Sequence, residues 1–179
     1  MKNVVKIFCL SIVVAAMSSV SIDAQTKGDK AVGVSFALGS GDGYSNYGIV
    51  AKYQKNLFDV VRLEGAFTYY LKKGETSMYD LSAYGHYLFK TSDVLTVYPL
   101  VGVGLWGVKS YKINYAAGAY EDEYEYDTKK TVENHLAISF GGGVDYMLTK
   151  KLVLNAEMKY KVVDYFNRFI ISAGVAYRF

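Results

Sequence analysis

The feature that most constrains the fold of this chain is a period-two alternation of apolar residues, which recurs in eight runs from Lys30 onward. In the last run, the apolar face consists of Phe169, Ile171, Ala173, Val175, Tyr177 and Phe179. Alternate side chains of a β-strand point to opposite faces, so each run predicts a strand with one apolar face. Each run is about ten residues long, the length of a tilted strand that spans a membrane. The sequence therefore predicts an all-β protein of eight strands.

The connections between the runs alternate in length. Residues 56–59, 90–93 and 149–151 form tight turns after the second, fourth and sixth runs. The other connections tend to be longer or richer in Gly and Tyr, most clearly residues 109–131. This asymmetry is typical of an antiparallel up-and-down barrel in the bacterial outer membrane, whose longer loops lie outside the cell. An even number of strands returns both termini to one side, and we expect both in the periplasm.

Alternation alone does not say which face of the strands points inward. A soluble lipocalin-like barrel also has eight strands, but its apolar face lines the inside. Here, aromatic residues gather near the strand ends of the apolar face, as in the interfacial girdles of membrane barrels. The opposite face carries many small residues, among them Gly33, Ser35, Gly102, Ser139 and Gly174. Glycine weakens an ordinary strand but suits the crowded interior of a narrow barrel, so we expect the apolar face to contact lipid.

The first 24 residues have the order of a secretory signal peptide. Lys2 and Lys6 form a short basic region, an apolar stretch follows, and small residues lead to Ala24. The apolar stretch is too short to span a bilayer. We expect cleavage after Ala24, which leaves residues 25–179 as one outer-membrane barrel domain. Because Cys9 lies in the leader, this domain has no disulfide and no thiolate metal site.

The charge of the chain argues against one class of partner. The sequence has 20 Lys and Arg against 17 Asp and Glu, a formal net charge of +3. A nucleic-acid-binding protein would carry a concentrated basic stripe, which this sequence does not have. We therefore expect no nucleic-acid partner.

Several stretches resemble the small outer-membrane β-barrel proteins related to the OmpA membrane domain and to OmpX. Residues 98–105 are similar to the fifth strand of that family, and residues 140–146 and 152–160 are similar to its sixth and seventh strands. Residues 174–179 are similar to its ending. The ending has an aromatic residue, Tyr177, two positions before the terminal Phe179. The resemblance implies insertion by the outer-membrane assembly machinery, which reads this last strand, and a location among outer-membrane lipid and lipopolysaccharide. It implies little about function, because the family includes structural proteins, adhesins and members without an assigned role.

The face expected to point inward carries the titratable residues Lys52, Arg62, Glu64, His86, Asp145, Glu157, Lys159 and Arg178. Charges inside so narrow a barrel are costly unless they are paired, so we expect salt bridges and bridging waters. Glu64 and Glu157 are the expected acidic centres, and their candidate partners are Arg62, Lys52 and Lys159. Such a network could line a gated ion pore or form a structural plug. The filled interior of eight-stranded barrels favours the plug.

The longest connection holds the sharpest concentration of charge, in the residues Glu121, Asp122, Glu123, Tyr124, Glu125, Tyr126 and Asp127. Tyrosines supply rigid contact area and acids attract cationic partners or Ca²⁺, which makes this segment a candidate surface-interaction loop. The alternative is a solvated loop, or a strand hairpin above the membrane whose acids face water. The acids do not follow the EF-hand pattern, so we assign no metal.

Catalytic residues are hard to assemble from this sequence. A lipase or acyltransferase on this scaffold needs a His, a Ser and an acid at one height. The only histidines are His86 and His135. Ser139 shares the face of His135 but lies roughly 13 Å away along the strand, and Ser92 with Asp93 has no His nearby. We therefore predict that the protein is not an enzyme and has no cofactor.

The sequence thus predicts a small integral barrel of the outer membrane with a structural or surface-interaction (adhesion-like) role. That role would reside in the outer loops, chiefly residues 109–131. The alternatives are a narrow channel for ions or small solutes and, third, a lipid A-modifying enzyme. No extracellular ligand follows from the residues themselves.

Overall fold

A computed structural model describes residues 27–41, 44–73, 76–114, 127–163 and 166–179, and the proposed signal peptide lies outside these ranges. The strands are β1 (Lys30–Gly41), β2 (Tyr44–Phe58), β3 (Val61–Lys73), β4 (Thr76–Tyr87), β5 (Phe89–Lys90), β6 (Leu95–Asn114), β7 (Asp127–Met147), β8 (Leu152–Val163) and β9 (Phe166–Arg178). Among the described residues, no helix is long and apolar enough to cross a membrane.

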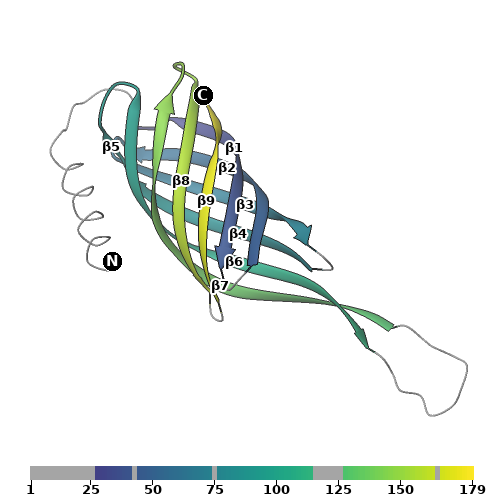
Figure 1. Cartoon of the computed structure of the whole chain (residues 1–179). Coiled ribbons are helices and arrows are strands. Elements are labelled where there is room, and N and C mark those ends of the chain that lie inside the picture. Colours follow the sequence, from purple (N-terminus) through teal and green to yellow (C-terminus); the bar gives the residue numbers. More distant parts are fainter. Residues whose placement is uncertain (1–26, 42–43, 74–75, 115–126, 164–165) are drawn as a thin grey trace, which may run out of the picture.

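The strands form one closed antiparallel sheet. Successive strands pair along the chain, and the sheet closes where β1 pairs with β9, from Ala31 opposite Arg178 to Ser40 opposite Phe169. β4 and β5 are two parts of one wall strand, because both pair with β6. Figure 1 shows the strands tilted around a common axis. The structure confirms the predicted eight-stranded up-and-down barrel.

The break between β4 and β5 has a simple cause. The pairing of β4 with β6 stops at His86 opposite Leu100, and the pairing of β5 with β6 starts at Phe89 opposite Val97. Pro99 lies in this gap, and proline has no N–H to donate to a neighbouring strand. The wall therefore loses its regular ladder over a short stretch near one end of the barrel, where the interruption costs least.

The two faces of the wall differ as the sequence predicts. Large apolar side chains on outward positions are exposed, from 37% for Tyr160 to 71% for Leu136. Inward positions are buried, and they include charged residues such as Lys52 and Glu157. A soluble eight-stranded barrel would bury its apolar face instead. The exposed apolar belt is therefore the lipid-facing surface of the protein.

The tight turns lie together at the end of the barrel that also holds the C-terminus (Figure 1). β2 and β3 are joined by residues 59–60, β5 and β6 by residues 91–94, and β7 and β8 by residues 148–151. These connections confirm the three predicted turns. We refer to this end as the turn end.

At the opposite end, the expectation of long loops is correct for one connection only. β1 and β2, β3 and β4, and β8 and β9 are each separated by two residues. Between β6 and β7 the strands themselves continue, and their pairing extends to Asn114 opposite Asp127. Residues 109–114 and 127–132 therefore form a paired arm rather than a loop, and Figure 1 shows it extending beyond the other strands. This paired arm agrees with the strand hairpin that the sequence left open as an alternative to a solvated loop.

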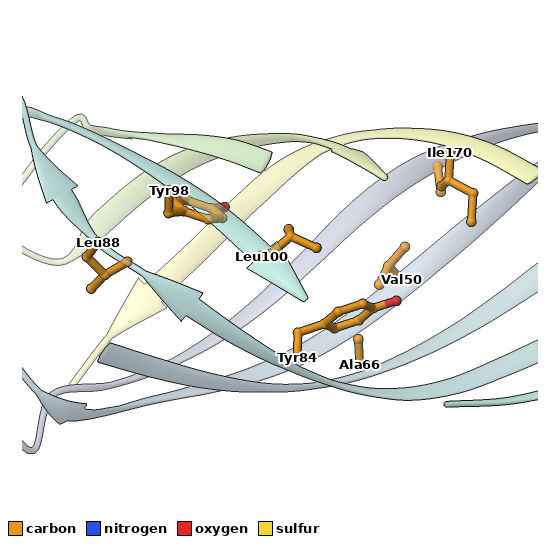
Figure 2. Close-up of a cluster of buried hydrophobic side chains, with 8 residues drawn as sticks. Val50, Ala66, Tyr84, Leu88, Tyr98, Leu100 and Ile170 are labelled. Atoms are coloured by element: carbon orange, nitrogen blue, oxygen red, sulfur yellow. The ribbon is translucent and has the colours of Figure 1, made fainter. Parts of the chain in front are cut away.

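Large aromatic side chains fill the inside of the barrel, and several lie directly across from a glycine. Tyr98 is opposite Gly143 in the β6–β7 ladder, and Tyr84 is opposite Gly102 in the β4–β6 ladder. A Cβ atom at Gly143 would lie 2.6 Å from the Tyr98 ring, so any larger residue would displace the ring. Figure 2 shows both tyrosines in one buried cluster with Val50, Leu100 and Ile170 from other parts of the wall. The predicted small residues of the lumen thus make room for rings.

Gly141 and Gly65 form a matched pair that tests this packing. A Cβ at Gly141 would collide with the backbone carbonyl of Met158 on β8, whereas a Cβ at Gly65 meets no atom within 4 Å. We expect Gly141→Ala to lower the free energy of unfolding by about 1–3 kcal/mol, because the wall must shift. Gly65→Ala should stay within about 0.5 kcal/mol of the unchanged protein. Urea titration in lipid vesicles measures both, and equal stabilities would contradict the close approach of β7 and β8.

Candidate functional site: the charged lumen and the arm

A buried ion network occupies the middle of the lumen, with Glu157 of β8 at its centre. Lys159 Nζ lies 2.7 Å from Glu157 Oε2, and Lys52 Nζ lies 2.8 Å from Glu157 Oε1. Lys52 Nζ is also 3.9 Å from Glu64 Oε2. The side chains of Lys52, Glu64 and Glu157 have no solvent exposure. Two lysines and two glutamates from three wall strands therefore neutralise one another across the lumen.

Neutral polar groups complete this central network. Asn155 Oδ1 accepts hydrogen bonds from Lys52 Nζ and from Ser35 Oγ, both at 3.1 Å. Gln54 Nε2 donates to Glu64 Oε2 at 2.7 Å, and Tyr98 Oη donates to Glu157 Oε1 at 3.1 Å. Buried charges are tolerated when their remaining hydrogen-bonding capacity is used in this way.

A second ion pair lies nearer the turn end and corrects one expectation from the sequence. Arg62 is not a partner of the two glutamates: its Nη1 lies 2.5 Å from Asp145 Oδ2. The reason is the position of these residues along the barrel axis. Arg62 is near the start of β3 and Asp145 is near the end of β7, and both positions lie at the turn end of the barrel. The Arg62 Nε donates to His86 Nδ1 at 3.1 Å, and the guanidinium lies 4.6 Å from the centre of the Tyr98 ring. Tyr98 therefore connects the two ion clusters.

A third cluster lies toward the arm, and sequence reasoning missed it. Lys161 forms an ion pair with Asp80, and Ser82 Oγ accepts a hydrogen bond from Lys161 Nζ at 3.0 Å. Arg168 lies with its guanidinium 4.9 Å from the centre of the Trp106 ring. Continuing the alternation from Lys159 to Lys161 would have found one of these residues.

Arg178 is the sequence-predicted member that lies apart from these clusters. Its side chain is half-buried at the turn end, where Nη1 lies 4.0 Å from Met147 Sδ. Arg178 does not take part in the salt bridges of the central network or of the Arg62 and Lys161 clusters. The network therefore brings together seven of the eight predicted residues, because His86 enters through its contacts with Arg62 and Tyr98.

Buried side chains occupy the lumen among the described residues. Trp106 and Tyr98 are completely buried, and Tyr70 is 1% exposed. Buried polar atoms without a protein partner among the described residues include Glu64 Oε1, His86 Nε2 and Ser139 Oγ. Buried waters satisfy groups of this kind in other proteins, consistent with the bridging waters expected from the sequence.

The structure shows the surroundings of one candidate catalytic residue, His86. Its ring stacks on Tyr98 at 4.7 Å, its Nδ1 receives the Arg62 hydrogen bond, and its Nε2 has no hydrogen-bond partner among the described residues. No group of three or more His, Cys, Asp or Glu residues in these ranges could hold a metal ion. Of the acidic segment, residues 121–126 lie outside the described residues, and Asp127 begins β7 opposite Asn114.

Replacing Glu157 by Gln tests the central network. The substitution keeps the shape but leaves Lys52 and Lys159 buried with less compensating charge. We expect the free energy of unfolding to fall by about 3 kcal/mol, measured by urea titration in vesicles. The control Glu133→Gln changes an exposed acid of β7 and should cost less than about 0.5 kcal/mol. Unchanged stability of the Glu157 variant, together with a clear rise in single-channel current, would identify a pore instead of a plug.

Known structures of small outer-membrane barrels are similar to this one. Ail, the attachment invasion locus protein of Yersinia pestis, has a TM-score of 0.59 and 17% identity over 86% of this chain and 100% of its own. Neisserial surface protein A has a TM-score of 0.56 and 17% identity over 84% of this chain and 96% of its own. The N-terminal barrel domain of Pseudomonas aeruginosa OprF has a TM-score of 0.55 and 19% identity over 87% and 100%. At these identities the likeness concerns the fold.

Sequence comparison extends this likeness to a family. No curated protein matches the chain significantly. The family model for the outer membrane protein beta-barrel domain matches residues 10–179, nearly the whole sequence. The chain therefore belongs to the outer membrane protein beta-barrel family.

Proposed function

We propose that this protein is a non-enzymatic outer-membrane barrel that acts at the cell surface through the arm formed by residues 109–114 and 127–132. The observation that carries the proposal is the continued pairing of β6 and β7 beyond the other strands (Figure 1). The turn end and the C-terminus lie at the opposite end of the barrel. With both termini in the periplasm, as we propose, the arm projects from the cell.

The chemistry of the arm supports a role in binding. Its paired strands carry Lys109, Lys112, Lys129 and Lys130, and the ladder places Lys112 directly opposite Lys129. Like charges opposite each other weaken a strand pair, so this pairing favours an anionic partner. Residues 121–126 between the strands, together with Asp127, add acids, which we propose as contacts for cationic groups of a partner, and tyrosines, which we propose as rigid contact area. Ail, which shares 17% identity with the chain, has been crystallised with the heparin analogue sucrose octasulfate, and this makes a sulfated polymer the first ligand to test.

The filled lumen argues against the main alternative, a channel. Inside the lumen, side chains from different strands contact each other, such as Tyr70 of β3 and Trp106 of β6, whose rings lie 5.0 Å apart. Ion pairs occupy other parts of the lumen. Barrels of eight strands leave room for side chains and little else.

The last strand supports a second proposed partner, the outer-membrane assembly machinery. Tyr177 and Phe179 are 46% and 63% exposed on the outer wall, at the turn end. β9 closes the barrel by pairing with β1, so its free edge would be available to the machinery before closure. In the finished barrel, outer-membrane lipid and lipopolysaccharide would contact these aromatic side chains.

Shortening the arm tests the proposed function. Ser110 is opposite Thr131, so a two-residue Asn-Gly turn can join them and replace residues 111–130 without changing the register. We expect this variant to keep the thermal stability of the barrel and to lose at least about tenfold in affinity for immobilised heparin, a loss of about 1.4 kcal/mol.

The same preparations separate the alternatives. Laminin and fibronectin surfaces, measured beside heparin, show whether a protein partner depends on the arm. Binding that is equal with and without the arm would contradict the proposal. Planar-bilayer currents in the unchanged protein would favour a channel, and altered lipid A masses in cells that carry the gene would favour an enzyme.

A further inference from the structure

The lipid-facing wall has a trough near the turn end, where small residues interrupt the apolar belt. Gly65, Ala83 and Gly85 lie side by side on β3 and β4, on outward positions. A Cβ at Gly65 or Gly85 would meet no atom within 4 Å, so the space above them is open. The trough has a volume of about 560 Å³, within the roughly 300–1,000 Å³ of small-molecule sites.

The ladders define the shape of this trough. One row across the wall runs from Lys55 through Leu63 and Gly85 to Val101, and the next runs from Tyr53 through Gly65 and Ala83 to Val103. Lys55 is close to the end of β2, whereas Val103 lies in the middle of β6. The trough therefore begins near the turn end of the barrel and runs obliquely along the outer wall toward the middle of the membrane. Apolar side chains such as Tyr53 and Val101 form its sides.

Lys55 lines the trough at the turn end, and a second lysine, Lys30, lies next to it on the neighbouring strand. Lys30 and Lys55 are directly opposite in the β1–β2 ladder, and both are exposed. The C-terminal residue Phe179 lies beside Lys30 through a backbone hydrogen bond of 3.0 Å. Neither lysine takes part in the buried salt bridges of the lumen. Like charges directly opposite each other destabilise a strand pair, so an anion between the two amines would stabilise this corner of the barrel.

We propose that the trough binds one glycerophospholipid, with an acyl chain over Gly65 and Gly85 and the phosphate between Lys30 and Lys55. Hydrocarbon alone gives little preference, because the surrounding bilayer is as apolar as the trough. Selectivity comes from the fit of one chain and from charge-assisted hydrogen bonds between the amines and phosphate oxygens. The choice of a phospholipid over lipid A rests on the orientation proposed above, since the turn end then lies in the inner leaflet.

Native mass spectrometry of the detergent-purified barrel tests this site. The first probe is palmitoyl-oleoyl phosphatidylglycerol. The second is palmitoyl-oleoyl glycerol, a diacylglycerol with the same acyl chains and no phosphate, and the third is lipid A. We expect one phosphatidylglycerol to remain bound and diacylglycerol to bind about tenfold more weakly, because it lacks the charge-assisted contacts. Retention of diacylglycerol equal to that of phosphatidylglycerol, or a preference for lipid A, would overturn the proposal.

Two independent variants locate the lipid. Gly85→Leu places a side chain in the trough, where a Cβ meets no atom within 4 Å, and the double change Lys30→Gln with Lys55→Gln removes the anion contacts. Each should weaken phosphatidylglycerol retention by about threefold to tenfold. The controls Ala156→Leu, on the lipid face of β8, and Lys150→Gln, in another turn, should leave retention unchanged. Loss in the controls, or none in either variant, would place the lipid elsewhere. These results do not depend on the arm, so a failure of the lipid proposal can be distinguished from a failure of the proposed binding by the arm.

Discussion

The structure depends on one constraint, which is that hydrocarbon offers no hydrogen bonds to the backbone. Every strand in the membrane therefore needs a partner on each side, and only a closed sheet provides this. The pairing of β1 with β9 supplies the last of these ladders. Pro99, which cannot donate, is accommodated near the end of the wall. Outside lipid this constraint no longer applies, and beyond Lys109 of β6 and before Ala137 of β7 the two strands pair only with each other among the described residues.

Closure with eight strands also fixes what the lumen can contain. The interior of an eight-stranded barrel is just wide enough for side chains to fill, and buried side chains occupy it here. Tyr98 over Gly143 shows one solution, in which a ring from one strand covers a glycine of the next. The Lys52–Glu157–Lys159 network shows the other, in which long charged side chains cross the lumen and compensate one another. Burying both partners of each pair makes the lumen rigid, and the outer surface remains free to specialise.

Alternation predicted the parts of the structure that depend on one strand at a time. It placed Glu64 and Glu157 inside and the apolar residues outside, because the face of a residue follows from its position in the strand. It did not predict which charges meet, since the partner of Arg62 depends on the relative heights of β3 and β7 on opposite walls. Asp80 and Lys161 were missed because the alternation was not followed as far as these residues, although Lys161 lies between the exposed Tyr160 and Val162. The length of the arm was not predicted, because a strand hairpin was only one of the alternatives for this connection.

The outer surface divides the protein into regions with different surroundings. An arm with lysines lies at one end, an apolar belt surrounds the middle, and the turn end carries the aromatic residues of the last strand. The trough at Gly65 and Gly85 interrupts the belt next to a lysine pair. The character of each region is set by the residues that lie on the outer surface of the closed barrel.

The central claim is that the apolar face contacts lipid while rings fill the lumen, and the single tryptophan of the chain reports on it. Trp106 is completely buried inside the barrel, whereas the neighbouring Leu105 is 46% exposed on the outer wall. The direct measurement is fluorescence in vesicles of brominated phospholipid. The account predicts weak quenching of Trp106 and strong quenching after Trp106→Phe is combined with Leu105→Trp. Strong quenching of Trp106 with little quenching of the new tryptophan would show that the faces are reversed.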